Sequence, residues 1–167
     1  MPDSPLIELL YGQGAHANTL ACVEDVPFEI AVRRDGKFPH SIWQLVWHMN
    51  FWMEYELARI REESPTYPAH ASESWPVDAR PARPDEWNEA VTRFRNNLAE
   101  LAKLAASPPD ILFKEVPALH RVQTENSSSL LAVLWQTVVH NTYHIGQVAM
   151  LRRESGAWPP KGGGDSW

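Results

Sequence analysis

Apolar residues recur every three or four positions in four long stretches of this 167-residue chain, a spacing that is typical of amphipathic α-helices. The stretches cover about residues 4–23, 41–63 (or from Pro39), 84–105 and 127–155. No run of alternating apolar and polar residues is comparable, and only residues 111–116 fit a short extended piece. Long connections separate the stretches, so the sequence predicts an all-α four-helix bundle with long connections.

Capping residues mark the start of the first predicted helix. Ser4 suits an N-cap and Pro5 suits the first helical position. Gly12 and Gly14 lie within the stretch, and each weakens a helix by about 1 kcal/mol. The apolar spacing nevertheless continues to Val23, and we expect one helix over this whole segment.

The fourth predicted helix has the residues of a complete helix at both ends. Asn126 or Ser127 is expected to cap its start, while two arginines in the last turn and the following Gly156 suit its end. By length the chain is one domain. We expect a single bundle domain over residues 1–157 and a non-helical C-terminal tail over residues 158–167.

Composition argues against several classes of protein. Lys and Arg number 15 and Asp and Glu number 21, so the net charge is −6, and no basic run suggests a nucleic-acid partner. The single cysteine, Cys22, cannot form an intrachain disulfide, which predicts a cytoplasmic location. No signal peptide is visible, and the longest apolar run, about residues 130–135, is far shorter than the roughly 20 residues of a membrane span. We therefore expect no membrane partner.

Two histidines in the fourth stretch stand out by their spacing. His140 and His144 are four residues apart, so a helix places both imidazoles on one face, one turn apart. That face belongs to the apolar stripe that should point into the core. Buried imidazoles must be hydrogen-bonded or ligated, because an unsatisfied buried polar group costs roughly 1–3 kcal/mol. The pair is therefore a candidate for two ligands of one metal ion.

A third histidine, His48, lies in the strongly apolar second stretch. Metal sites in helical bundles are built from side chains on facing helices, so His48 is a candidate third ligand. Three neutral imidazoles leave a divalent ion its full charge and an open coordination position, as in catalytic sites. The alternative interpretation is that all three are hydrogen-bonded core histidines. Asn141 stands where a zincin-type protease has its general base, and that chemistry is disfavoured.

Other polar residues are candidate members of the same site. Gln147 lies one turn beyond His144 and can hydrogen-bond a ligand histidine or a bound water. His16, on the inner stripe of the first helix, is a candidate proton donor, and both residues are candidate catalytic groups. Cys22 is expected to be a core residue rather than a nucleophile. His40 is expected to be exposed to solvent.

Three segments together carry a family resemblance: Trp47-His48-Met49, the stretch from His140 to Gln147, and Leu151-Arg152-Arg153. In this order the chain resembles the DinB-like (DinB/YfiT) superfamily over nearly its whole length. The resemblance implies a four-helix bundle, a divalent metal (nickel or zinc) bound by His48, His140 and His144, and a homodimer. Characterised relatives include bacillithiol-dependent S-transferases, a mycothiol-dependent maleylpyruvate isomerase and proteins described as metal-dependent hydrolases.

Two functional hypotheses follow for the three-histidine site. In the first, the metal lowers the pKa of a thiol or a water molecule, which attacks a small electrophilic molecule. The protein is then a metal-dependent thiol S-transferase or a hydrolase, with a low-molecular-weight thiol as cosubstrate in the first case. In the second, the protein is a non-catalytic, metal-binding, stress-related dimer, whose tryptophan-rich second helix forms the subunit contact.

Overall fold

A computed structural model describes residues 4–34, 38–117 and 128–162. The described chain is mainly helical, which confirms the all-α prediction. Its elements are α1 (Pro5–Leu10), α2 (Ala21–Glu24), α3 (Phe28–Ala31), α4 (Ile42–Ile60), the 3-10 helix η1 (Ala71–Ser74), α5 (Asp85–Ala105), α6 (Pro109–Leu112), β1 (Glu115–Val116), β2 (Ser128–Ser129) and α7 (Leu130–Glu154).

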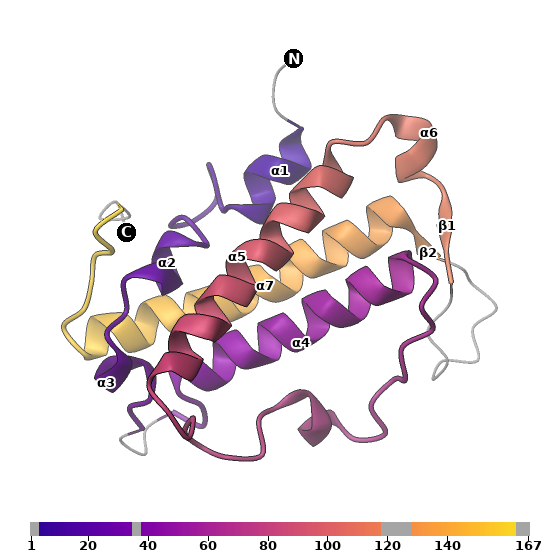
Figure 1. Ribbon diagram of the computed structural model, residues 1–167. Helices are drawn as coiled ribbons and strands as arrows, with labels where there is room; N and C mark the ends of the chain where they lie inside the picture. The colour runs from indigo at the N-terminus through magenta and orange to yellow at the C-terminus, as the bar shows by residue number, and fades with distance from the viewer. Residues whose placement is uncertain (1–3, 35–37, 118–127, 163–167) are drawn as a thin grey trace.

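The three long helices α4, α5 and α7 lie side by side and enclose the core (Figure 1). Helix α4 contacts both of the others and runs antiparallel to α7. This central place explains why α4 is apolar on most of its sides. The largest fully buried apolar side chains come from all three helices: Ile42, Leu45, Met49, Met53, Phe94, Leu98, Leu101, Leu134 and Ile145.

The predicted first helix is much shorter than expected. Helix α1 ends at Leu10, and the chain becomes helical again only at α2, so a continuous helix to Val23 was wrong. Gly12 and Gly14 have φ angles of 76° and 73°, in the left-handed region that interrupts a helix. A Cβ atom on Gly12 would lie 2.5 Å from a ring carbon of His16. The glycines thus end the helix, and α1 packs against α5 and α7 as a short element.

The second and third predicted helices agree with α4 and α5. Ser41 caps α4 through a reciprocal capping box: its hydroxyl accepts from the Gln44 backbone N–H at 3.2 Å, and the Gln44 side chain accepts from the Ser41 N–H at 3.0 Å. At the other end, Glu62 and Ser64 have positive φ angles. The capping box fixes the N-cap residue of α4, Ser41, seven positions before His48.

Helix α7 begins later than predicted. Its N-cap is Ser129, whose hydroxyl accepts from the Ala132 N–H at 3.2 Å, while the predicted caps Asn126 and Ser127 lie outside the described residues. Before this helix, β2 pairs antiparallel with β1. The extended piece expected over residues 111–116 is therefore reduced to the last two of them, since α6 occupies residues up to 112.

The end of α7 agrees with the prediction. Gly156 has a φ angle of 72°, and its N–H donates to the Arg153 carbonyl at 3.1 Å. The Ala157 N–H donates to the Arg152 carbonyl at 2.8 Å, which completes a Schellman motif. None of the described helices is both long and apolar enough to cross a lipid bilayer.

A buried arginine attaches the N-terminal segment to α7. Arg152 is 1% exposed, and its guanidinium donates to the carbonyls of Ala21, Cys22 and Ala157 and to the Asp25 carboxylate at 2.7 Å. Burial alone would favour the neutral acid, but the Arg152 contact holds the pKa of Asp25 below its ordinary value. Almost all the hydrogen-bonding capacity of this guanidinium is therefore used inside the protein.

The described part of the tail follows the same surface. The Asp25 carboxylate also accepts from the Lys161 backbone N–H at 2.6 Å. Trp158 packs against the core, and the Arg153 guanidinium lies 4.4 Å from the centre of its ring. Residues 158–162 form no helix, and residues 163–167 lie outside the described chain.

Replacing the buried arginine should destabilise the fold strongly. We expect Arg152→Met to lower the free energy of unfolding by about 3 kcal/mol, because it leaves Asp25 and several carbonyls without a donor. Arg153→Met is the matched control and should cost less than about 1 kcal/mol, since its side chain is exposed and its cation–π contact with Trp158 is weak. Urea unfolding of both variants is the measurement, and equal losses would contradict the role given to Arg152.

Candidate metal centre

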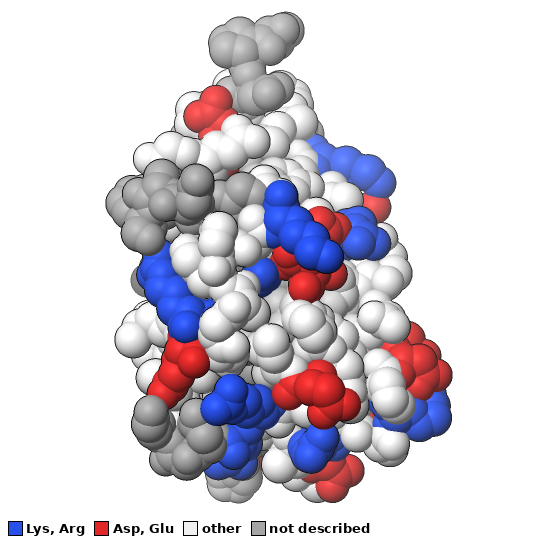
Figure 2. Space-filling view, turned by 90° about the vertical axis from the view of Figure 1, so that its left-hand side faces the viewer, with Lys and Arg blue, Asp and Glu red and all other residues white. Residues whose placement is uncertain are grey.

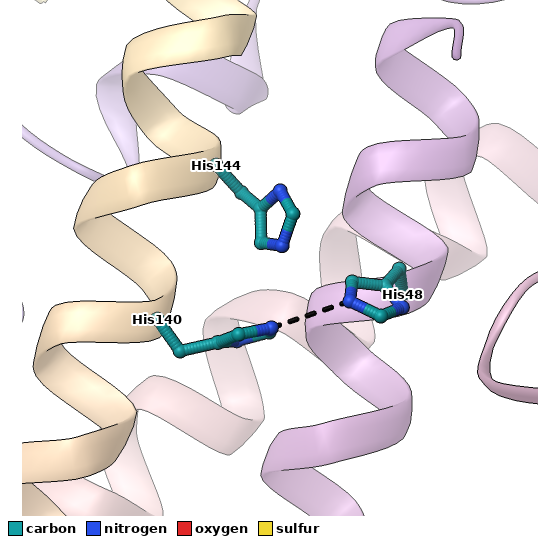
Figure 3. A group of neighbouring side chains, drawn as sticks. All are labelled: His48, His140 and His144. Atoms are coloured by element: carbon teal, nitrogen blue, oxygen red, sulfur yellow. Dashed lines mark hydrogen bonds between the residues drawn. The ribbon is translucent and has the colours of Figure 1, made fainter. Parts of the chain in front are cut away.

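Three histidine rings meet between α4 and α7 (Figure 3). His48 comes from α4, and His140 and His144 come from α7. One nitrogen of each ring lies within 4.8 Å of the others, and His48 Nε2 is 3.2 Å from His140 Nε2. The residues predicted as metal ligands are thus brought together from positions 92 residues apart in the chain.

The backbone carbonyl of Ser74 sets the orientation of the His48 ring. His48 Nδ1 lies 2.8 Å from this oxygen, and a carbonyl only accepts hydrogen bonds, so Nδ1 carries the proton. Nε2 then presents its lone pair toward the α7 histidines. The Trp75 ring stacks on the outer side of His48, with ring centres 3.9 Å apart. Sequence reasoning missed Ser74, the last residue of η1, and Trp75, which follows it, since neither belongs to a motif.

Gln147 does the same for His144. Its side-chain oxygen Oε1 accepts from His144 Nδ1 at 2.8 Å, one turn further along α7. This bond leaves His144 Nε2 without a proton. Histidine ligands in metal sites commonly donate their other ring N–H to such an acceptor, which fixes the tautomer. Gln147 therefore lies where the sequence placed it, bonded to a candidate ligand.

The donor set fits a divalent transition metal. Imidazole nitrogens bind zinc at about 2.0–2.1 Å, so two of them in a tetrahedral site lie about 3.3 Å apart. In the metal-free protein His140 Nε2 donates to the unprotonated His48 Nε2 at 3.2 Å, a separation that two ligands of one zinc ion would also have. Among the described residues, the group contains three imidazoles and no carboxylate or thiol.

Burial keeps these histidines in the neutral form that binds metals. It lowers the pKa of both His48 and His140 from 6.5 to about 4, and the neighbouring imidazoles act in the same direction. Burial also lowers the pKa of His144. All three rings are therefore neutral at pH 7, and a metal ion meets little competition from protons there.

The structure places His16 away from this group. Its Nδ1 donates to the Ala17 carbonyl at 2.8 Å, and its Nε2 accepts from the Thr142 hydroxyl at 3.1 Å. Thr142 lies about 200° around α7 from His140 and His144, on the opposite face of that helix. Of the two candidate catalytic residues, only Gln147 hydrogen-bonds a member of the histidine group, His144.

His40 is not exposed to solvent, contrary to expectation. It is half-buried, and its ring stacks on Trp75 with centres 3.7 Å apart, on the side away from His48. Burial, followed by the nearby Arg34 guanidinium, lowers the pKa of His40. No sequence motif predicts this contact, because it depends on where the loop that carries Trp75 lies against the start of α4.

Cys22 is a core residue, as expected. It is fully buried, and burial raises the pKa of its thiol to about 11. A thiol in that state is not a nucleophile near neutral pH.

Fold and site together define an all-α protein with a buried three-histidine group suited to a divalent metal. The model of the DinB family matches residues 1–163, and the chain belongs to that family. The resemblance predicted from the sequence motifs is thereby confirmed. No curated protein and no solved structure matches the chain.

The stability of the metal-free protein should fall as the pH is lowered from about 7 to 4. In this window the unfolded chain protonates these histidines near pH 6.5, whereas folded His48 and His140 stay neutral down to about pH 4. Each proton that only the unfolded chain binds lowers the free energy of unfolding by roughly 1.4 kcal/mol for each pH unit of acidification. Urea unfolding at several pH values measures this slope.

Two variants separate the buried histidines from other titrating groups. His140→Asn should flatten the slope, because one buried imidazole no longer discriminates between the two states. His70→Asn, at an exposed position, should leave it unchanged. A slope that is the same in wild type and His140→Asn would show that burial does not hold this ring neutral.

Proposed function

We propose that His48, His140 and His144 bind a divalent metal ion, zinc or nickel. The ion would serve one of two reactions on a small molecule: transfer of a thiol to it, or its hydrolysis. The observation that carries this proposal is the group of three neutral imidazoles with no described carboxylate or thiol beside it. Three neutral ligands leave the charge of the ion uncompensated and a coordination position open. A closed structural site would need a fourth protein ligand.

When bound, such an ion supplies Lewis acidity, which lowers the pKa of a thiol or water ligand to near neutrality. The chain itself supplies the orientation of the rings. Ser74 and Gln147 hold the Nδ1 protons of His48 and His144, so that both Nε2 atoms face the same point. Trp75 covers the outer side of the His48 ring and excludes water there.

A thiol nucleophile would have to come from outside the chain. Cys22 is the single cysteine and is buried with a raised pKa. We therefore propose a low-molecular-weight thiol as cosubstrate for S-transfer, and water as the nucleophile for hydrolysis. A chain without an intrachain disulfide suits the cytoplasm, which we propose as its location.

The proposed partner is a small molecule rather than a nucleic acid. The net charge of the chain is −6. On the face in Figure 2, blue basic and red acidic side chains are interspersed, without a continuous basic surface among the residues described there. Binding to a phosphate backbone depends on such a surface.

Elemental analysis of protein purified without a histidine tag tests the metal site. We expect about one equivalent of zinc or nickel per chain, and a stoichiometric loss in His144→Ala. Gln147→Leu should weaken metal affinity by about 10–100-fold, since the acceptor that orients His144 is removed. His70→Ala is the control for general loss of histidine. Full metal content in His144→Ala would refute the site.

A thiol-consumption assay and an ester-hydrolysis assay test the activity. Metal-loaded wild type should accelerate at least one of them over His144→Ala, because only the wild type holds the ion through three ligands. Equal rates for both proteins would favour the alternative, a non-catalytic metal-binding protein.

We also propose that α1 is the short member of a four-helix bundle, because it contacts both α5 and α7. The proposed homodimer contact is on α7 rather than on the tryptophan-rich α4, which lies between other helices. Large apolar side chains on α7 are more than half exposed and lie within about 80° of one another around the helix: Trp135, Val139 and Tyr143.

The α7 contact can be tested by sedimentation. We expect wild type to sediment as a dimer and Trp135→Glu as a monomer, because a buried charge at the contact is costly. Val77→Glu, at a fully exposed apolar position outside α7, is the control and should remain dimeric. A dimer that persists in Trp135→Glu would contradict an α7 contact.

A further inference from the structure

We propose that a cavity next to the three histidines binds a compact, neutral carbonyl compound, with the Gln147 side-chain amide donating to the carbonyl oxygen. The cavity has a volume of about 200 Å³ and lies between the start of α4 and the last turns of α7. This inference rests on the proposed function, because it names the substrate class of that same site.

The position of the cavity follows from the direction of the two helices. Leu45 lines it from α4, three residues before His48, and Gln147 lines it from α7, three residues after His144. Because the helices are antiparallel, both offsets lead toward the same end of the bundle. The cavity therefore lies about one helical turn from the histidine group.

The lining favours a mostly apolar ligand. Phe38, Leu45, Met150 and Leu151 contribute apolar surface, and none of the lining residues carries a carboxylate, guanidinium or ammonium group. A cavity of about 150 Å³ in another protein holds benzene, so this volume suits a ring of about that size with one substituent. A cation would gain no partner here and would be repelled by the proposed metal ion.

Gln147 supplies the polar contact. Its Oε1 is occupied by His144 Nδ1, whereas its amide nitrogen donates to no other described residue. That nitrogen carries two donors and no acceptor, so it selects a ligand with an acceptor oxygen. His40, also in the lining, has a buried Nδ1 without a hydrogen-bond partner. The cavity thus contains two polar groups with unused hydrogen-bonding capacity in an apolar wall.

The probe is cyclohexanone, titrated into metal-free protein and followed by NMR. We expect shifts of the Gln147 side-chain N–H signals and of the Leu45 and Leu151 methyl signals. Methylenecyclohexane has the same shape without the acceptor and should bind at least tenfold more weakly. Cyclohexylammonium should cause no such shifts. Equal binding of all three probes would overturn the hydrogen-bond assignment.

Two variants test the two parts of the proposal. Met150→Trp should fill the cavity from its exposed rim and weaken cyclohexanone binding at least tenfold. Gln136→Trp, at an exposed position elsewhere on α7, is its matched control. Gln147→Glu keeps an acceptor for His144 Nδ1 but removes both donors. It should therefore weaken cyclohexanone binding to the metal-free protein at least tenfold.

The outcomes distinguish this inference from the proposed function. Cyclohexanone binding that is unchanged in Met150→Trp and Gln147→Glu overturns the cavity as the binding site. Binding that depends on both Met150 and Gln147 supports the cavity as the binding site, even if elemental analysis finds no metal. In that case only the proposed metal-dependent function is refuted. Loss of binding in Gln136→Trp would also overturn the assignment, because that position does not line the cavity.

Discussion

Burying three imidazoles between two helices is the constraint on which the rest of this structure depends. Each ring must be neutral, and each ring N–H needs an acceptor, because an unsatisfied buried polar group is costly. The Ser74 carbonyl and the Gln147 amide oxygen meet this requirement for His48 and His144. The same bonds direct the Nε2 lone pairs of His48 and His144 to one point, so stability and the proposed metal binding depend on the same contacts.

Hydrogen bonds on the face of α4 away from His48 fix the rotation of this helix about its own axis. Asn50 lies two residues after His48, about 200° around the helix, and donates to the Ala90 carbonyl of α5 at 2.9 Å. Asn97 of α5 donates in turn to Asn50 at 3.2 Å and to Glu54 at 3.3 Å. These hydrogen bonds are directional, so they specify how α4 and α5 are aligned more strictly than apolar packing does. They keep His48 facing α7.

The loop before α5 completes the site from outside the bundle. Trp75 is stacked between His40 and His48, so two segments far from α7 in sequence close over the histidine group. Gln147 connects that group to the neighbouring cavity, with its oxygen on a candidate ligand and its nitrogen toward the proposed substrate. In the proposed function, this one side chain would relate metal binding to substrate choice.

The sequence alone determined the long helices and the three candidate ligands, because helical periodicity, capping and i, i+4 spacing are local properties. The sequence also identified Gly12 and Gly14 as positions that weaken the first helix. It did not predict that the helix would end before them, at Leu10. Only the tertiary structure decided that His40 stacks on Trp75 and that His16 faces away from the site. Those contacts join segments distant in the chain, and they depend on how loops return and helices rotate when the core packs.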